Sequence, residues 1–381
     1  MSRSGIFLLA TGLACATLAW AETAPAPAPE STGLRLGAVL PLSGEAAMFG
    51  ASAKQGIELA VAEWNAKGGV AGGRIKLFVG DDHGDPARGV EAVTALIEQD
   101  HVAAVVGAVM SKVSLACGPI CQLAQVPMVS PSSTNPKVTL VGDFIFRACI
   151  IDPFQGTLGA KFAYEDLRAR KVACLFDEGN DYTKGLSSAF RAKFTALGGQ
   201  VNGFASHPSG ITQFKPQLTQ LLAAKPDLLY TSDYYKEVAL IALQARELGF
   251  TGPILGGDGW DSPRLAQVAG HAIDGCFFTN HYALDNPDTA YQAFVGRFRA
   301  AFDCDPDQLA ACGYEAANLV LDAANRAGSN AGPAIRDALK EAGFQGLLGT
   351  IRLDADRNPV KPAVVLELRN GKPVYRATVA P

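Results

Sequence analysis

The sequence contains few charged residues, and neither sign is in large excess. Charged residues make up 18% of the 381 positions, with 33 Lys and Arg against 37 Asp and Glu. A net charge of −4 provides no basic surface for nucleic acid, so we expect no nucleic-acid partner. Hydrophobic residues reach 48%, which is typical of a globular protein, and the length is sufficient for two domains with separate cores.

The sequence also lacks the common motifs of catalytic sites. The chain has no G-x-S-x-G nucleophile elbow and no phosphate-binding loop, and its five histidines are scattered without metal spacing. Residues 81–85 (DDHGD) offer carboxylates that suit a hard cation, but they lack the spacing and the glycine position of a calcium loop. We interpret this segment as a turn at a strand end. We therefore expect no enzyme activity, no metal site and no cofactor.

Long apolar runs are absent beyond the N-terminus. Residues 1–21 combine Arg3, an apolar run from Ile6 to about Leu18 and the small-x-small triplet Ala19-Trp20-Ala21. This pattern predicts a secretory signal peptide cleaved after Ala21, and the run is short for a transmembrane span. The segment Gly12-Leu13-Ala14-Cys15 raises the alternative of a lipoprotein signal. We favour it less because Gly12 stands three positions before Cys15, where an aliphatic residue is usual.

A Pro/Ala-rich segment follows the predicted cleavage site. Residues 22–33 (ETAPAPAPESTG) cannot bury apolar surface, so we expect an extended, disordered tether. Together with the signal peptide, this predicts a soluble protein exported to the periplasm, which we expect to be a monomer.

From Leu34 onward the pattern alternates between apolar strands and amphipathic helices, first over 34–125 and again over 154–256. Such alternation predicts βαβ units and parallel sheets with right-handed crossovers. The last hundred residues add three helices and two late strands, at 349–353 and 363–368. The fold class is therefore α/β, with two doubly wound parallel-sheet lobes.

The segment 127–136 (PMVSPSSTNP) begins and ends with proline and contains a loop of hydroxyl residues. Met128 and Val129 are typical of a short buried strand, and the prolines that follow fix φ and forbid a helix. Hydroxyl and backbone N–H groups at such a strand end suit a small anion such as a carboxylate. Taken alone, the segment is more typical of a surface turn. Its hydroxyl residues are Ser132, Ser133 and Thr134.

Other strand ends carry polar or aromatic side chains. In an open parallel sheet, ligands bind in the crevice outside the carboxyl ends of the strands. The first set of units supplies mainly hydroxyls, and the second supplies aromatic rings and one carboxylate. This combination suits a zwitterion with an apolar side chain. The residues, besides those of the hydroxyl loop, are Phe49, Ser111, Tyr182, Tyr234 and Asp258.

Several short motifs together indicate a known family. They are 37–44 (GAVLPLSG), 65–70 (NAKGGV), Asp81-Asp82 with Asp85-Pro86, Val129-Ser130-Pro131 with Thr134, Tyr182 with Gly185, and 256–260 (GGDGW). The chain from Leu34 to Val374 resembles the periplasmic type I solute-binding proteins of the leucine/isoleucine/valine-binding kind, the receptors of ABC amino-acid uptake systems.

The resemblance implies two lobes that are joined by three hinge strands and close on the ligand. We place lobe 1 at 34–151 plus 284–350 and lobe 2 at 152–283 plus 351–381. The crossings are expected near Ile151, near Ala283 and near Thr350.

The resemblance also implies a role for each candidate residue. Ser111 and Thr134 are expected to bind the α-carboxylate of the ligand, with Ser132 and Ser133 beside them. Asp258 is expected to bind the α-ammonium group. The remaining three, Phe49, Tyr182 and Tyr234, are expected to line the pocket.

The chain departs from the branched-chain receptors at three places. They have Tyr, Glu and a disulfide near the cleft of the first lobe, where this chain has Phe49, Asp258, and Gly84 with Met110. Seven cysteines remain outside the signal peptide. Cys304 and Cys312 are spaced to close a small ring, and Cys117 and Cys121 lie one turn apart on a predicted helix. We expect Cys174 and Cys276 to be free core thiols.

We therefore predict a non-enzymatic protein that binds a neutral or branched-chain amino acid and delivers it to an ABC permease in the inner membrane. One alternative is an aromatic or other carboxylate without an amino group, but it leaves the carboxylate of Asp258 without a cation. Another is an extracellular ligand-sensing module, which requires a separate signalling partner.

Overall fold

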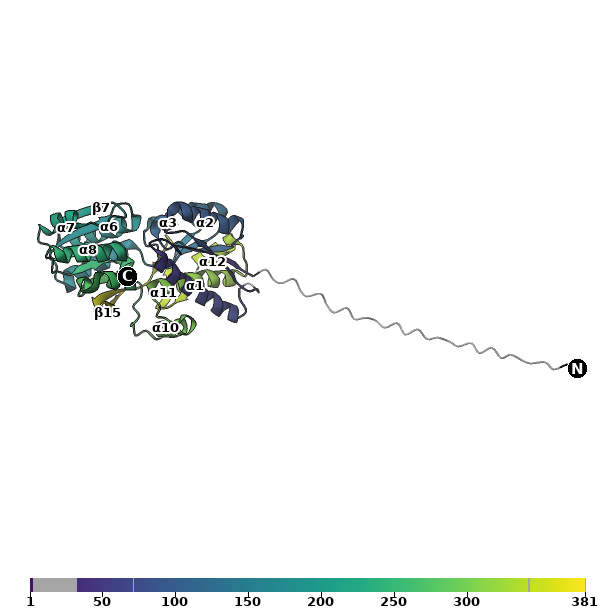
Figure 1. Cartoon of the computed structure of the whole chain (residues 1–381). Coiled ribbons are helices and arrows are strands. Elements are labelled where there is room, and N and C mark those ends of the chain that lie inside the picture. The colour runs from purple at the N-terminus through teal and green to yellow at the C-terminus, as the bar shows by residue number, and fades with distance from the viewer. Residues whose placement is uncertain (3–32, 71, 342, 381) are drawn as a thin grey trace. The chain divides into compact units, whose positions relative to one another are not determined.

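The computed structural model describes residues 1–2, 33–70, 72–341 and 343–380. The predicted signal peptide from residue 3 and the tether up to residue 32 lie outside the described residues. Residues 32–381 form one compact unit (Figure 1). Within the described ranges, no helix is long and apolar enough to cross a membrane.

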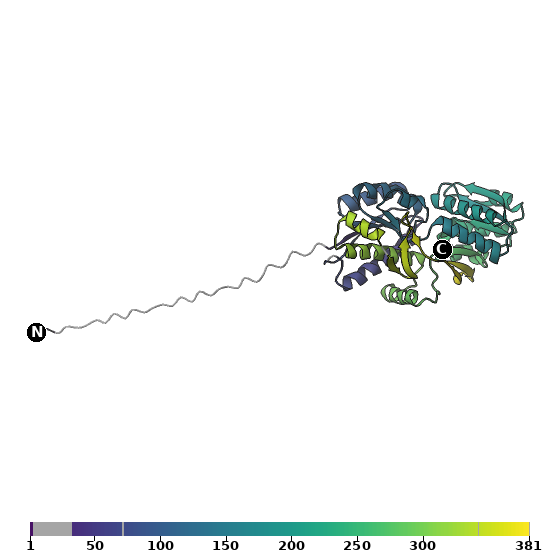
Figure 2. The ribbon, with the colours of Figure 1, turned by 180° about the vertical axis from the view of Figure 1, so that it is seen from behind.

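In the part of the chain that the structure describes, one sheet has five parallel strands in the order β2-β1-β3-β4-β5. We call this sheet and its helices lobe 1, which Figures 1 and 2 show from opposite sides. The strands are β1 (Arg35–Leu40), β2 (Lys76–Asp81), β3 (Ala104–Gly107), β4 (Met128–Ser130) and β5 (Ile145–Arg147). The helices are α1 (Ala47–Ala66), α2 (Pro86–Glu98), α3 (Ser111–Ala124), α4 (Lys137–Leu140), α10 (Thr289–Phe302), α11 (Gln308–Ala327) and α12 (Gly332–Lys340).

The inner strand β1 of lobe 1 is apolar because helices cover both faces of the sheet. Leu36, Val39 and Leu40 of β1 are all buried, and each such side chain contributes about 1.5–3 kcal/mol when removed from water. Helices α1 and α11 pack together closely through glycine. A Cβ atom added to Gly56 would lie 1.9 Å from the carbonyl oxygen of Ala310, so any larger residue at this position would push the helices apart.

A second sheet, also built from described residues, has seven strands in the order β15-β14-β10-β9-β8-β6-β7. Five of them are parallel, and β14 and β15 are added antiparallel at one edge. We call this sheet and its helices lobe 2. The strands are β6 (Lys171–Asp177), β7 (Gln200–His207), β8 (Leu228–Thr231), β9 (Ile254–Gly256), β10 (Phe277–Asn280), β14 (Ala363–Arg369) and β15 (Lys372–Val379).

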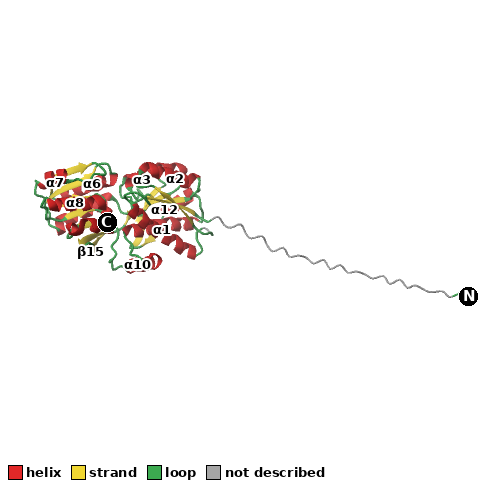
Figure 3. Cartoon of the chain, viewed as in Figure 1, coloured by secondary structure: helices red, strands yellow, loops and turns green. Residues whose placement is uncertain are grey.

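Helices also cover lobe 2 on both sides of its sheet (Figure 3). They are α5 (Asp152–Lys161), which continues into the π-helical turn η1 (Phe162–Asp166), α6 (Asp181–Ala196), α7 (Lys215–Leu222), α8 (Tyr235–Glu247) and α9 (Pro263–Ala269). Two 3₁₀ turns complete the lobe, η2 (Asp258–Trp260) and η3 (Gly270–Ile273). The predicted α/β class with two doubly wound lobes is confirmed.

The chain passes between the lobes through three segments of residues 33–380. The first joins β5 to α5, and the second joins β10 to α10. The third leaves a small antiparallel sheet beside α11, formed by β11 (Gly343–Gly346), β12 (Gly349–Leu353) and β13 (Pro359–Val360), and enters β14. From these strand pairings we place the third crossing at 361–362 rather than near Thr350, which lies inside β12.

Candidate functional site

The candidate residues lie at equivalent positions of the two sheets. In lobe 1 the strand order changes direction between β1 and β3, and in lobe 2 it changes direction between β6 and β8. Loops diverge at such a switch point and leave a crevice at the carboxyl ends of the strands. Phe49 and Ser111 follow β1 and β3, whereas Tyr182 and Tyr234 follow β6 and β8. In each lobe, the candidate residues therefore follow the two strands on either side of the switch point.

The lobe 1 side of the site is the N-terminus of α3. This helix begins at Ser111, and its N-cap residue, Met110, provides no side-chain hydrogen bond to the first turn. The first N–H groups of a helix carry a partial positive charge and commonly bind anions. Ser111 is buried and its Oγ accepts a hydrogen bond from the Asn135 N–H at 3.3 Å. This end of the site is suited to a carboxylate.

The three hydroxyl residues of the loop after β4 have different surroundings. Ser132 lines the cavity described below, and its Oγ donates to the Val109 carbonyl at 3.1 Å. The Oγ of Ser133 contacts the carbonyls of Ala108 and Val109 and the hydroxyl of Ser114, so it holds the loop in place. Thr134 is buried next to Asp152, and its Oγ1 has no well-formed hydrogen bond in the described structure. Neither Ser133 nor Thr134 lines the cavity.

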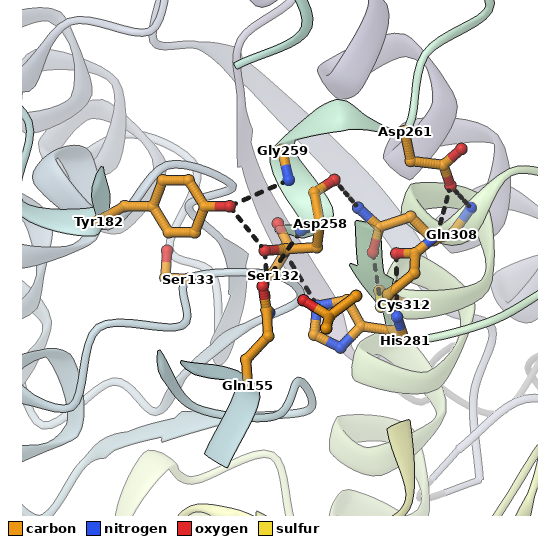
Figure 4. Close-up of polar contacts among 12 residues, drawn as sticks. Ser132, Ser133, Gln155, Tyr182, Asp258, Gly259, Asp261, His281, Gln308 and Cys312 are labelled. Carbon is orange, nitrogen blue, oxygen red and sulfur yellow. Dashed lines mark hydrogen bonds and ion pairs between the residues drawn. The ribbon is translucent and has the colours of Figure 1, made fainter. Parts of the chain in front are cut away.

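Asp258 is the centre of a buried polar network on the lobe 2 side (Figure 4). Its Oδ1 accepts hydrogen bonds from the Tyr182 hydroxyl at 2.9 Å and from the Gln155 amide at 3.0 Å. Its Oδ2 lies 3.2 Å from Nε2 of His281. The backbone N–H of Asp258 also donates to Gln155 Oε1 at 3.1 Å. Gln155 therefore forms hydrogen bonds with both the side chain and the backbone of Asp258. The carboxylate is therefore held in one orientation, facing the cavity.

Tyr182 remains a proton donor in this network. Burial, together with the negative charge of Asp258, raises the pKa of Tyr182 well above its usual range. Its hydroxyl also accepts a hydrogen bond from the Gly259 N–H at 3.1 Å. Because Oδ1 of Asp258 already has two donors and Oδ2 has one contact, the open capacity of this carboxylate lies mainly on Oδ2.

Aromatic rings from both lobes close the site. Tyr182 stacks on Tyr234 with ring centroids 5.3 Å apart, and Phe49 of lobe 1 meets Tyr234 edge-on at 5.8 Å. The cavity between them is small, with a volume of about 20 Å³, little more than the space that one water molecule needs. It is lined by Phe49, Val109, Met110, Ser111, Ser132, Tyr182, Tyr234, Asp258, Gly259, Gln308 and Leu309.

Besides several apolar lining residues and Gly259, three polar side chains at the site were not predicted. Gln155, His281 and Gln308 come from α5, from the segment after β10 and from the start of α11. Gln308 lines the cavity, and its amide lies 3.3 Å from the backbone carbonyl oxygen of Asp258. No local pattern distinguishes the two glutamines from surface residues. His281 follows a strand that the sequence pattern did not reveal.

Gly84 and Met110 face each other near the cleft of lobe 1. A Cβ atom added to Gly84 would lie 3.0 Å from Sδ of Met110. The seven cysteines within 33–380 are free. The small ring predicted from the spacing of Cys304 and Cys312 does not form, because Cys304 is exposed in the loop whereas Cys312 is buried in α11.

The acidic segment at 81–85 is occupied by turn hydrogen bonds. Oδ1 of Asp81 accepts from the N–H groups of Leu42 and His83, and Oδ1 of Asp82 accepts from the Gly84 N–H. Asp85 caps α2 through the N–H groups of its first turn. Among the described residues, no group of three His, Cys, Asp or Glu side chains is arranged to hold a metal ion.

Comparison with known proteins identifies the family. Residues 33–373 match the family model described as "Periplasmic binding protein". The Leu/Ile/Val-binding protein homolog 2 of Brucella abortus (strain 2308) is 34% identical over 345 residues, which cover 89% of this chain and 91% of that relative.

Solved structures share the fold over almost the same length. The leucine binding protein LivK from Thermotoga maritima MSB8 is 38% identical with a TM-score of 0.87, and the match covers 91% of this chain and 99% of that one. A solute binding protein of an ABC transporter from R. palustris, solved in complex with benzoate, is 25% identical with a TM-score of 0.83, covering 92% and 97%. The chain therefore belongs to the periplasmic binding protein family.

Proposed function

We propose that this protein binds a neutral α-amino acid with an apolar side chain, such as a branched-chain amino acid, between its two lobes. Proteins of this family are solute receptors of ABC transporters and are not enzymes. In this proposal the closed, ligand-bound form delivers the amino acid to the permease in the inner membrane.

One observation carries the proposal: a single cavity combines an anion site, a carboxylate and an apolar wall. The uncapped start of α3 and Ser111 suit the ligand's carboxylate, and Asp258 suits its ammonium group. Val109, Met110 and Leu309 supply apolar surface for the side chain. A second charged group on the ligand has no partner among these lining residues, which favours neutral side chains.

A carboxylate without an amino group is a second candidate. Tyr182, Gln155 and His281 all contact the carboxylate of Asp258, so this group is hydrogen-bonded even without a ligand cation. A similar structure is known with bound benzoate. The two candidates share the anion site and differ only in whether Asp258 pairs with the ligand.

Calorimetry with a matched pair of ligands separates the candidates. Leucine and 4-methylpentanoate differ only in the amino group. If Asp258 pairs with the ammonium group in a dry cleft, loss of its charge in Asp258→Asn costs about 2–5 kcal/mol, or more than about tenfold in the affinity for leucine. The wild type is expected to prefer leucine strongly.

The control is Asp227→Asn, which makes the same substitution at the opposite end of the lobe 2 strands, before β8. We expect it to leave both affinities unchanged. Equal binding of both ligands by the wild type, or an unchanged leucine affinity in Asp258→Asn, would reject the amino-acid assignment in favour of the carboxylate.

We also propose that the mature protein is periplasmic and begins at Glu22. The family is extracytoplasmic. The small-x-small triplet before the Pro/Ala-rich segment supports cleavage after Ala21. Mass spectrometry of protein recovered from the periplasm is expected to show Glu22 at the N-terminus without lipid, and a diacylated Cys15 would contradict this.

A further inference from the structure

One buried lysine contacts two of the three segments that join the lobes and itself belongs to the third. Lys361 lies at the third crossing, between β13 and β14. Its Nζ donates to the carbonyl oxygen of Ala148, at the start of the first crossing, at 3.0 Å. It also donates to the hydroxyl of Tyr282, in the second crossing, at 3.0 Å, and lies 4.8 Å from the centre of the same ring. All three crossings thus meet at one ammonium group.

The same ammonium group is tied to lobe 1. Nζ of Lys361 lies 2.6 Å from Oε2 of Glu315, which belongs to α11. The other oxygen of Glu315 accepts the N–H of Leu347 at 2.7 Å, beside the small sheet. Both side chains are buried. Burial alone would lower the pKa of Lys361. The charge of Glu315, its hydrogen bond to the lysine and the neighbouring Cys312 and Cys149 together outweigh burial and raise the pKa.

The contacts hold the crossings at different ends. Ala148 directly follows the last strand of lobe 1 and Glu315 lies in a lobe 1 helix, whereas Tyr282 follows β10 of lobe 2 by two residues. The clamp therefore fixes the first and third crossings at their lobe 1 ends, and it ties the lobe 2 end of the second crossing to α11 through the same lysine. Rotation of lobe 2 must then be taken up by the few residues beyond the clamp in the first and third segments, such as 149–151 and Pro362.

We propose that Lys361 is a positioning residue for ligand binding: by clamping the three crossings to α11, it limits how far the lobes open and so raises the affinity for the ligand. It acts without touching the ligand, because neither Lys361 nor Glu315 lines the cavity. When a protein spends less time in its binding-competent state, its apparent dissociation constant rises in proportion. This inference rests on the proposed function in one respect, because it requires that the lobes close on a ligand. It does not depend on which ligand binds.

The test removes both charges at once. A single Lys361 substitution would leave the buried charge of Glu315 without an opposite charge, at a cost of about 3–5 kcal/mol to stability. The double variant Lys361→Met/Glu315→Gln avoids this and keeps an acceptor for the Leu347 N–H. We expect its leucine affinity to fall about threefold or more. The ratio of leucine to 4-methylpentanoate affinity stays that of the wild type, because the contacts to the ligand are intact.

Small-angle scattering of the ligand-free protein provides a readout that does not depend on any ligand. The double variant is expected to have a larger radius of gyration than the wild type. The control is Arg336→Met/Asp143→Asn, which removes an ion pair in lobe 1 away from the crossings and is expected to change neither quantity. A milder variant, Tyr282→Phe, loses only one hydrogen bond to Lys361 and is expected to shift both quantities in the same direction by less.

A lower melting temperature with unchanged affinity and unchanged radius of gyration in the double variant would show that the clamp only stabilises the fold, and would overturn the proposal. A changed ratio between the two ligands would also overturn it. Failure of leucine to bind the wild type would reject the proposed function alone, since the scattering comparison still tests the clamp.

Discussion

Residues that line the cavity were predictable where the end of an apolar strand marked them. Asp258 lies in the motif GGDGW directly after an apolar strand, and it does line the cavity. Gln155 contacts Asp258 from 103 positions away, and His281 reaches it from 23 positions away. Sequence spacing says nothing about such contacts, because they exist only once the lobe has folded. The partners that orient the carboxylate of Asp258 are therefore residues that sequence reasoning misses.

Asp152 provides a prediction on pH dependence. Its carboxyl is buried at the start of α5, and burial is the main cause that raises its pKa to about 8. In the unfolded chain the pKa of Asp is about 3.9. The folded protein therefore keeps a proton that the unfolded chain loses between about pH 4 and pH 8, so this group makes the free energy of unfolding fall as pH rises through that window.

Asp152→Asn replaces the carboxyl by a neutral amide of the same size, so it removes this dependence. We expect the melting temperature of the variant, relative to the wild type, to rise by several degrees between pH 5 and pH 8.5, measured by calorimetry. The exposed Asp166→Asn serves as the control, with a constant difference. A constant difference for Asp152→Asn as well would show that this carboxyl does not titrate in that window.

At the scale of elements, the first N–H groups of α3 have no side-chain cap. Asp85, Asn180 and Asp288 cap α2, α6 and α10 through side-chain hydrogen bonds to the first turn. Several other described helices also begin without such a cap, but the start of α3 lies at the cavity beside Ser111. Its first N–H groups therefore suit a ligand anion.

Two serines near this helix end are predicted to separate binding from stability. Ser111 lines the cavity, so Ser111→Ala should weaken leucine binding through the loss of about 0.5–1.5 kcal/mol of hydrogen bonding. The melting temperature should fall only slightly, because the Asn135 N–H loses a single long hydrogen bond of 3.3 Å. Ser133 instead bonds the carbonyls of Ala108 and Val109. Ser133→Ala should leave these buried groups with fewer partners and lower the free energy of unfolding by about 1–3 kcal/mol.

Calorimetric titration and thermal unfolding of both variants check this prediction. The expected pattern is a larger change in affinity for Ser111→Ala and a larger change in melting temperature for Ser133→Ala. The reverse pattern would show that Ser133, rather than Ser111, is the serine that contacts the ligand.

Most elements followed from the alternation of apolar strands and amphipathic helices. The strand β10 was missed because its four residues give too short a pattern beside the crossing that follows. The strand β15 had an unused signal. Asn370-Gly371 both have positive φ between β14 and β15, which is the two-residue turn of a β-hairpin.

At the scale of the whole molecule, the two lobes share one topology. The parallel strands of each sheet have the same relative order, and residues beside each switch point line the cavity. The family resemblance predicted this arrangement, and the match over residues 33–373 confirms the family. The third crossing could not be placed from the sequence. The short strand β13 is recognisable only through its pairing with β12, and it moves the crossing from near Thr350 to Lys361.

We propose that the two lobes hold opposite ends of one amino acid, and a crystal structure of the mature protein with bound leucine is the decisive measurement. We expect the ammonium nitrogen within about 2.7–3.2 Å of an Asp258 carboxylate oxygen, and the ligand carboxylate at the N-terminus of α3 beside Ser111. A leucine whose amino group points away from Asp258, or one bound outside the cavity between Phe49 and Tyr182, would show that the lobes do not hold the ligand in this way.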